Sequence, residues 1–245
     1  MMSRDGFVVF DHDPRTARWA HAAHNVAARL ATDPQVRAQN LRHGDTWFVG
    51  VDLLPNDRQG AVENVPLAGP WQTDVPDLLL HPAQVSIVYP GYPARDPDQS
   101  EANHRYRVTR MAAHVDGLLP EGKDRRRFPR EFHAYILGLP LKDVSASPTV
   151  VWKGSHIIMQ AALADVIGGR DPKTVDVTEA YHAARREVFE RCDAVPMAAR
   201  PGQAFLIHRM ALHGTAPWTG PPGAGRMIAF FRPEFADPRD WLNDL

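Results

Sequence analysis

From residue 84 onward, the sequence consists of short apolar segments separated by turn-forming residues. Strands are predicted over 84–89, 131–139, 149–152, 195–199, 203–208 and 226–232. Pro201-Gly202 is typical of a tight turn between two of these strands. Two other segments, 157–166 and 178–192, have helical character. Many short strands with helices between them predict a mainly β fold with flanking helices, arranged as a sandwich or a barrel.

The first 83 residues begin with a helix rather than a strand. Asp13 is a suitable N-cap, and Pro14 is a suitable first helical residue. Apolar side chains at helical spacing follow at Ala20, Ala23, Ala27 and Leu30. Asp33-Pro34 is expected to end or kink this helix. A strand is then predicted over 46–54, followed by a Pro- and Asp-rich connector to residue 77.

Composition excludes several classes of protein. The 245 residues, 44% of them hydrophobic, suit one large domain with a buried core. The formal net charge of -1 provides no electrostatic basis for binding nucleic acid or a membrane surface. The single cysteine, Cys192, excludes an internal disulfide and a Cys-rich zinc site. Without a signal peptide or an 18-residue apolar run, the protein is expected to be soluble and cytoplasmic.

A candidate metal site is formed by His114, Asp116 and His213. Two imidazoles and one carboxylate can occupy one face of an octahedral Fe(II) and leave the opposite face open, as in non-haem iron oxygenases. His114 and Asp116 follow the segment 104–113, which is predicted to run as a strand into a loop. Because residues i and i+2 of a strand point to the same side, both side chains would reach one ion.

A second His-x-Asp sequence occurs at His43-Gly44-Asp45, as expected by chance in a chain with 12 histidines. It lies in a polar turn directly before the predicted strand 46–54. We therefore interpret this copy as a turn rather than as metal ligands. His208, five residues before His213, is the rival for the second histidine ligand, but its position in a strand favours a wall or core residue. His156 is expected to stabilise its turn.

Several segments resemble the phytanoyl-CoA dioxygenase-like 2-oxoglutarate/Fe(II) oxygenases. They occur in the order found in that family and span roughly residues 84 to 235. The matching segments are Met111-Ala112-Ala113-His114-Val115-Asp116-Gly117, Val150-Val151-Trp152-Lys153-Gly154-Ser155-His156, Pro201 to Gly214, and Arg226-Met227-Ile228-Ala229-Phe230. Lys153 and Gln203 depart from the family, which usually has proline and an acidic residue there.

The resemblance implies a double-stranded β-helix, a cupin-like jelly roll with iron at its open end. It implies Fe(II) bound by His114, Asp116 and His213, and 2-oxoglutarate held by Arg226, whose planar fork pairs with a carboxylate through two hydrogen bonds. The implied activity is a dioxygenase that uses O2, hydroxylates a small molecule and releases succinate and CO2. Related halogenases have a small residue in place of the metal carboxylate, so Asp116 argues against halogenation.

The whole chain, 1–245, is then expected to be a single oxygenase domain. The jelly-roll core would span about 84–235, residues 1–83 would form a helical and strand cover, and a short tail would follow. Tyr135 is a weaker candidate for a hydrogen bond to the co-substrate. Arg125 and Arg126 lie in a basic run after the first ligands, and two interpretations stay open: a contact to an anionic substrate, or a solvated loop.

Two other functions compete with a 2-oxoglutarate-dependent hydroxylase. One is a cupin-like metal enzyme or metal-binding protein that uses no keto acid and therefore has no need for Arg226. The other is a non-catalytic β-sandwich binding module with incidental histidines, which would bind no stoichiometric iron. The sequence identifies neither the substrate nor the oligomeric state.

Overall fold

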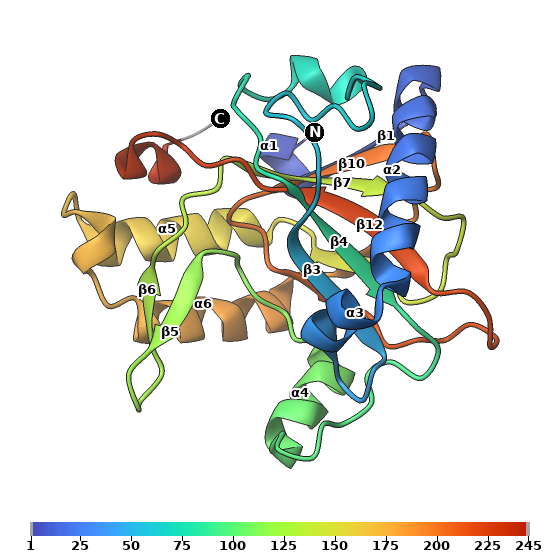
Figure 1. Cartoon of the computed structure of the whole chain (residues 1–245). Helices are drawn as coiled ribbons and strands as arrows, with labels where there is room; N and C mark the ends of the chain where they lie inside the picture. The colour runs from blue at the N-terminus through green and yellow to red at the C-terminus, as the bar shows by residue number, and fades with distance from the viewer. Residues whose placement is uncertain (1, 244–245) are drawn as a thin grey trace.

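The computed structural model describes residues 2–243 and is built around two antiparallel sheets (Figure 1). The larger sheet has seven strands in the order β1-β10-β7-β12-β4-β3-β2. They are β1 (Phe7–Phe10), β10 (Ala204–His208), β7 (Tyr135–Pro140), β12 (Arg226–Phe231), β4 (Ala83–Val88), β3 (Trp47–Leu54) and β2 (Leu41–Arg42). The smaller sheet has the order β11 (His213–Thr215), β8 (Thr149–Trp152) and β9 (Ala194–Pro196).

Helices cover the outer faces of both sheets. The α-helices are α1 (Met2–Asp5), α2 (Pro14–Thr32), α3 (Pro34–Asn40), α4 (Glu101–Arg110), α5 (Ser155–Ile167) and α6 (Thr178–Arg191). Three short 3-10 helices are η1 (Pro70–Thr73), η2 (Pro172–Thr174) and η3 (Pro238–Leu242), and β5 (Leu118–Glu121) pairs with β6 (Arg126–Pro129) as a separate hairpin. The mainly β fold with flanking helices is therefore confirmed.

Alternate side chains of a strand point to opposite faces of its sheet, and on the central strands β7 and β8 the side chains of both faces are buried. On β12, Met227 and Ala229 belong to an outer core with α2, whereas Ile228 packs between the two sheets. That inner core also contains Val151 of β8 and Phe205 of β10, so the sheets face each other. A third core lies between β8 and the helices α5 and α6, which run side by side in Figure 1.

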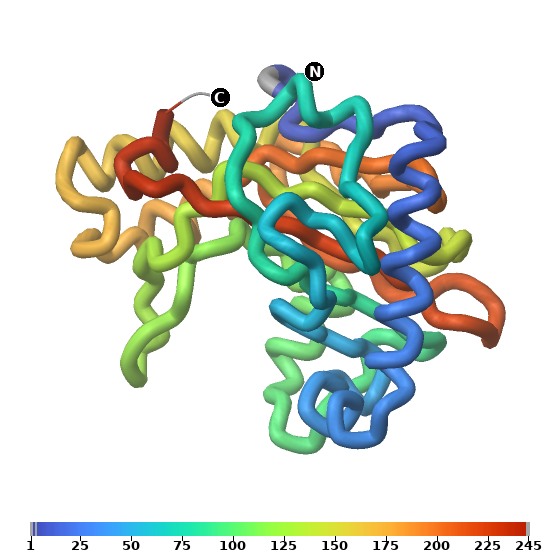
Figure 2. Tube along the Cα trace, turned by 45° about the horizontal axis from the view of Figure 1, so that its top comes forward, coloured from blue at the N-terminus to red at the C-terminus, as the bar shows by residue number. Residues whose placement is uncertain are grey.

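The α2 helix begins and ends as its sequence predicts. The Asp13 side chain accepts hydrogen bonds from the backbone N–H groups of Arg15 and Thr16, and Asp33 ends α2 and caps α3. The Trp19 ring then packs on Phe231 of β12, with 5.8 Å between ring centroids. The segment between β3 and β4 passes over the same outer face, as Figure 2 shows, and contributes Val62 and Trp71 to that core.

The N-terminal 83 residues do not only cover the predicted jelly-roll core but also form part of the large sheet. They supply β1, β2 and β3 to the seven-stranded sheet, where β3 pairs with β4 and β1 pairs with β10. The sheet therefore extends beyond the predicted core of 84–235. It needs these strands because β4 and β10 would otherwise expose an unpaired edge.

The strand predicted over 104–113 is wrong. Residues Glu101–Arg110 form helix α4, whose N-cap Ser100 accepts a hydrogen bond from the backbone N–H of Asn103. The helix has no fully buried residue. A half-buried strand would instead bury every second side chain, and the segment lacks the alternating apolar residues for that. Met111 and Ala112, at φ 56° and 50°, end the helix in left-handed conformations and turn the chain toward the candidate metal site.

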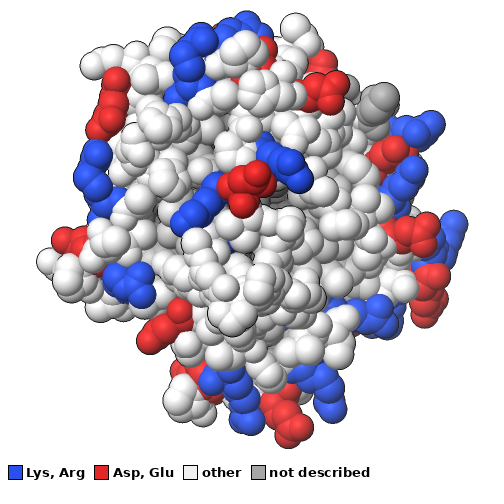
Figure 3. Space-filling model, turned by 90° about the vertical axis from the view of Figure 1, so that its right-hand side faces the viewer, with Lys and Arg blue, Asp and Glu red and all other residues white. Residues whose placement is uncertain are grey.

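Charges of both signs are interspersed on the surface. In Figure 3, Lys and Arg side chains lie beside Asp and Glu side chains, so the face drawn carries no large patch of one sign. Among the described helices, none combines the length and the apolar composition that crossing a bilayer requires.

Candidate metal and co-substrate site

An antiparallel bridge brings the two candidate histidine ligands together. The backbone N–H of His114 donates to the His213 carbonyl at 2.9 Å, and the N–H of His213 donates to the His114 carbonyl at 3.0 Å. Residues paired in this way project their side chains on the same side. The two imidazole rings lie 4.7 Å apart, between centroids. The predicted pairing of His114 with His213 therefore follows from main-chain geometry.

Asp116 completes the cluster. Its Oδ1 lies 3.0 Å from His114 Nε2 and 3.6 Å from His213 Nε2. One ligand atom from each of the three residues can be chosen so that all lie within 4.8 Å of one another. Imidazole nitrogen and carboxylate oxygen suit Fe(II), and three protein ligands leave three positions of an octahedron free. The donor set therefore fits a divalent iron.

Each histidine is oriented by the carbonyl two residues before it. His114 Nδ1 lies 2.9 Å from the Ala112 oxygen, and His213 Nδ1 lies 3.0 Å from the Ala211 oxygen. A carbonyl can only accept, so Nδ1 carries the hydrogen and Nε2 is the nitrogen that faces the cluster. Such outer hydrogen bonds fix the ring orientation of metal-binding histidines.

The charges within the cluster stabilise one another. Burial alone would raise the pKa of Asp116, but His213, His114 and Arg232 outweigh it and hold that pKa well below the usual range. Burial by itself would lower the pKa of His213, yet the Asp116 carboxylate raises it. The carboxylate is thus ionised at neutral pH, which is the state that binds a cation.

Arg226 provides a buried cation at the start of β12. Its side chain is 3% exposed, and its Nη1 donates to Thr149 Oγ1 at 3.5 Å. Nε and Nη2 are buried without a hydrogen-bond partner among the described residues. Burial lowers the pKa of Arg226 to about 10, so the group stays protonated at neutral pH. A buried guanidinium with two unused donors fits a carboxylate ligand, which would restore the missing bonds.

A cavity of about 230 Å³ lies beside the cluster and extends to Thr149, although Arg226 itself is not among its lining residues. His114, Asp116 and His213 line it, as does Thr149, the partner of Arg226. The rest of its wall is formed by Trp47, Val49, Val51, Gln84, Ser86, Ile136, Gly214, Thr215, Phe230 and Arg232. The predictions missed these residues. The lining residues on β3 and β12 lie at alternate positions of their strands, and this spacing is a signal in the sequence. Trp47, Val49 and Val51, for example, share one face of β3.

The structure contradicts the predicted role of Tyr135. This residue lies on β7 with its side chain in the outer core, and it lines a different cavity together with Trp71 and Leu137. The next residue, Ile136, lines the cavity at the metal site. Successive side chains of a strand point to opposite faces, so Tyr135 cannot reach a co-substrate bound beside Thr149.

Arg125 and Arg126 also lie away from the cavity. Both belong to the β5–β6 hairpin, which projects from the sheets in Figure 1. Arg126 forms ion pairs with Asp176 at 2.6 Å and Glu179 at 2.8 Å. Neither arginine is among the residues that line the cavity, so its lining gives no support to a contact with an anionic substrate, and the solvated-loop interpretation fits their position.

The rival histidines lie outside the cluster, as predicted. His208 is buried in β10, where its Nδ1 accepts a hydrogen bond from the backbone N–H of Met210 at 3.1 Å. His156 packs against it, with 4.9 Å between ring centroids. The segment His43 to Asp45 is a turn whose first two backbone N–H groups donate to Asp96. The turn interpretation is therefore confirmed.

Gly214 allows the first-ligand segment to approach β11 closely. A Cβ at this position would lie 2.3 Å from the backbone oxygen of Met111. We expect Gly214→Ala to lower the free energy of unfolding by about 1–3 kcal/mol and to weaken metal binding, because the clash displaces the segment that carries His114. Denaturant unfolding and metal titration measure both effects.

Gly223→Ala is the matched control, since an added Cβ there meets nothing within 4 Å. If Gly214→Ala unfolded at the same denaturant concentration as Gly223→Ala and bound metal normally, the close approach would have no energetic importance.

The fold and the cluster define a two-sheet β protein of the double-stranded β-helix type, with a 2-His-1-carboxylate site between its sheets. Its structure is similar to that of SnoK, a non-heme alpha ketoglutarate dependent carbocyclase from nogalamycin biosynthesis. The TM-score is 0.53, and the match covers 94% of this chain and 79% of SnoK at 12% sequence identity. At that identity, the likeness shows the fold alone.

Two further solved structures match with TM-scores below 0.5. EctD from S. alaskensis with bound Fe has a TM-score of 0.48 and 16% identity, over 95% of this chain and 74% of EctD. The epimerase SnoN from nogalamycin biosynthesis has a TM-score of 0.47 and 14% identity, over 100% of this chain and 86% of SnoN. No family model and no curated protein matches the sequence. The narrower resemblance to phytanoyl-CoA dioxygenase-like enzymes stays a prediction.

Proposed function

We propose that this protein is an Fe(II)- and 2-oxoglutarate-dependent dioxygenase that hydroxylates a small molecule. The observation that carries the proposal is the combination of the His114–Asp116–His213 cluster with the buried, unsatisfied guanidinium of Arg226. A cupin-like metal protein without a keto acid would gain nothing from that guanidinium, and leaving it unpaired is costly. The dependence of the carbocyclase SnoK on alpha-ketoglutarate is compatible with the proposal.

The residues of this chain divide the work between them. Fe(II), 2-oxoglutarate and O2 would supply the oxidising chemistry, with succinate and CO2 as the co-products. His114, Asp116 and His213 would hold the metal through Nε2, Oδ1 and Nε2. Arg226, assisted by Thr149, would bind the distal carboxylate of the keto acid and thereby orient its other end toward the metal.

The substrate would enter over a mainly apolar wall. Trp47, Val49, Ile136 and Phe230 line the cavity on the side of the large sheet. The cavity of about 230 Å³ is smaller than most sites for drug-sized ligands, so it suits a small substrate or the reacting end of a larger one. Its lining includes one cation, Arg232, which is paired with Asp116, so we propose an uncharged reacting group.

The first test is anaerobic. Fe(II) is added to the protein, followed by 2-oxoglutarate, and the weak visible charge-transfer band of the bidentate chelate is recorded. The proposal predicts a band that saturates at one equivalent of each. Bound iron without a band would favour a cupin-like protein that uses no keto acid, and no bound iron would favour a binding module.

The oxidative outcome needs a separate measurement because the structurally similar SnoK is a carbocyclase. Once a substrate is found, product mass under 18O2 distinguishes hydroxylation from cyclisation or epimerisation. Incorporation of one labelled oxygen atom into the product is expected.

A further inference from the structure

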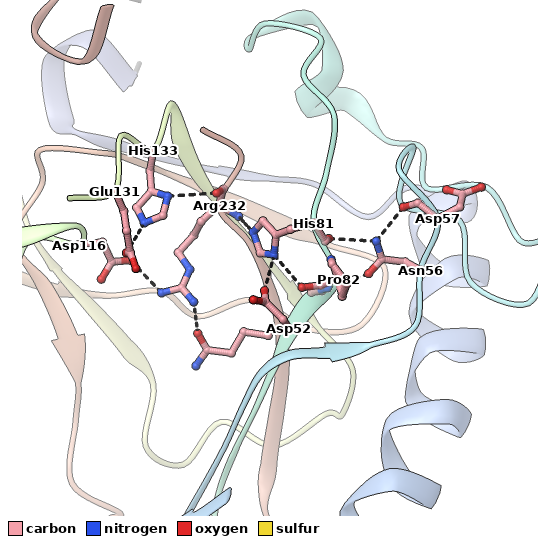
Figure 4. A network of polar contacts seen from close by, with 11 residues as sticks. Asp52, Asn56, Asp57, His81, Pro82, Asp116, Glu131, His133 and Arg232 are labelled. Atoms are coloured by element: carbon pink, nitrogen blue, oxygen red, sulfur yellow. Dashed lines mark hydrogen bonds and ion pairs between the residues drawn. The ribbon is translucent and has the colours of Figure 1, made fainter. Parts of the chain in front are cut away.

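We infer that Arg232 is a positioning residue that presents a single oxygen of Asp116 to the metal. The inference rests on the proposed function, because it concerns the same metal site. Asp116 Oδ1 faces the two histidines, whereas its Oδ2 lies 3.3 Å from Arg232 Nη1. The two carboxylate oxygens therefore have different partners, as Figure 4 shows for the contact with Arg232.

Arg232 is itself held in place from several directions. Its Nη2 donates to Gln84 Oε1 on the neighbouring strand β4. Its backbone N–H donates to His81 Nε2 at 3.0 Å, and its carbonyl lies 3.1 Å from His133 Nδ1. Glu131 contacts the other nitrogen of His133 at 3.0 Å. Arg232 is therefore anchored through both its main chain and its side chain (Figure 4).

This anchoring has a consequence for coordination. Because Arg232 engages Oδ2, Oδ1 is the oxygen that the carboxylate would present to a metal held by His114 and His213. An outer partner of this kind fixes the orientation of a metal ligand. The side chain of Arg232 is 19% exposed and that of Asp116 is 10% exposed, so water screens the pair only partly.

Arg226 and Arg232 thus have separate roles on the same face of the sheet. Arg226 is the first residue of β12, and Arg232 directly follows its last residue. Positions 226, 228, 230 and 232 share that face by strand alternation. At one end of this face, Nε and Nη2 of Arg226 have no partner among the described residues and fit a ligand carboxylate. At the other end, Arg232 is already paired with the carboxylate of Asp116.

Binding of Mn(II), measured from the loss of the free-ion EPR signal, tests the inference without any turnover. We expect both Arg232→Met and Arg232→Lys to raise the dissociation constant for Mn(II) by about 10–100-fold, the usual effect of losing an outer partner of a metal ligand. Lysine keeps the charge but not the two-pronged contact to Asp116 and Gln84. Arg186→Met, at an exposed position on α6, is the control and should bind Mn(II) like the wild type.

Other outcomes are equally informative. If charge repulsion were the dominant effect, Arg232→Met would bind Mn(II) more tightly and Arg232→Lys would equal the wild type, which overturns the inference. Unchanged binding in both variants would also overturn it and would leave Arg232 as a substrate contact. A wild type that binds no Mn(II) would instead refute the proposed function.

Gln84→Met provides a second variant in case Arg232 variants fold poorly. It removes one anchor of the guanidinium and leaves the Arg232–Asp116 pair present, so we expect a smaller loss of Mn(II) affinity than in Arg232→Met. Thermal unfolding of each metal-free variant establishes that the comparison is made between folded proteins. An affinity unchanged in Gln84→Met would contradict the role of Gln84 as an anchor.

Discussion

Replacing His213 with alanine is expected to weaken Fe(II) binding by more than about 100-fold, since even outer partners of metal ligands are worth about 10–100-fold. His213 is 8% exposed and its Nε2 faces Asp116, and among the described residues the candidate ligand group consists of His114, Asp116 and His213, so the variant keeps only two of the three. Anaerobic titration with Fe(II), followed by metal analysis of the desalted protein, measures the loss. The band formed with 2-oxoglutarate should disappear as well.

His208→Ala is the matched control for this prediction. His208 is also a buried histidine in the same part of the chain, but it lies outside the cluster and accepts a hydrogen bond from the Met210 backbone. Its replacement should lower stability and leave the stoichiometry of iron unchanged. If His208→Ala lost iron and His213→Ala retained it, the assignment of the second histidine ligand would be wrong.

Replacing Arg226 with methionine is expected to abolish 2-oxoglutarate binding without destabilising the metal-free protein. Two charge-assisted hydrogen bonds to a carboxylate contribute about 3–6 kcal/mol together, so the affinity should fall at least about 100-fold. In the metal-free protein, two of its nitrogens are buried without a partner in the part of the chain that the structure describes, a state that costs about 1–3 kcal/mol per group. Methionine removes that cost, so the melting temperature should stay constant or rise.

The two measurements for Arg226→Met must be read together. Loss of the charge-transfer band with normal Fe(II) binding and an unchanged or higher melting temperature identifies a ligand-binding residue. Arg226→Lys, which keeps the charge but not the planar fork, should have an intermediate affinity. A large drop in melting temperature with normal 2-oxoglutarate binding would show that Arg226 is a structural residue.

Local sequence patterns predicted much of the fold because short-range chemistry determines them. The Asp13-Pro14 start of α2 and the Asp33-Pro34 break follow from capping and from the missing N–H of proline. The segment before His114 gives no clear signal because its polar residues have no clear period, and the N-cap of α4, Ser100, lies upstream of the predicted strand. Met111 and Ala112 then adopt left-handed conformations that their residue types do not suggest.

Tyr135 shows why a face cannot always be read from a sequence. The segment around β7 becomes continuously apolar because both of its faces are buried, so the pattern loses the alternation that identifies inside and outside. An assignment that is wrong by one residue exchanges the two faces. The structure places Ile136, and not Tyr135, in the wall of the metal site.

The sequence alone determined the chemical types and the spacing of the candidate ligands: His114 and Asp116 two residues apart, a distant His213, and Arg226 on a strand that follows it. Only the tertiary structure decided that the bridge between His114 and His213 closes the cluster, that Nε and Nη2 of Arg226 are left without a partner among the described residues, and that Arg232 holds Asp116. The reason is physical. Residue type and local spacing limit what a side chain can bind, but its partners come from strands far apart in the chain, and pairing and burial select among them.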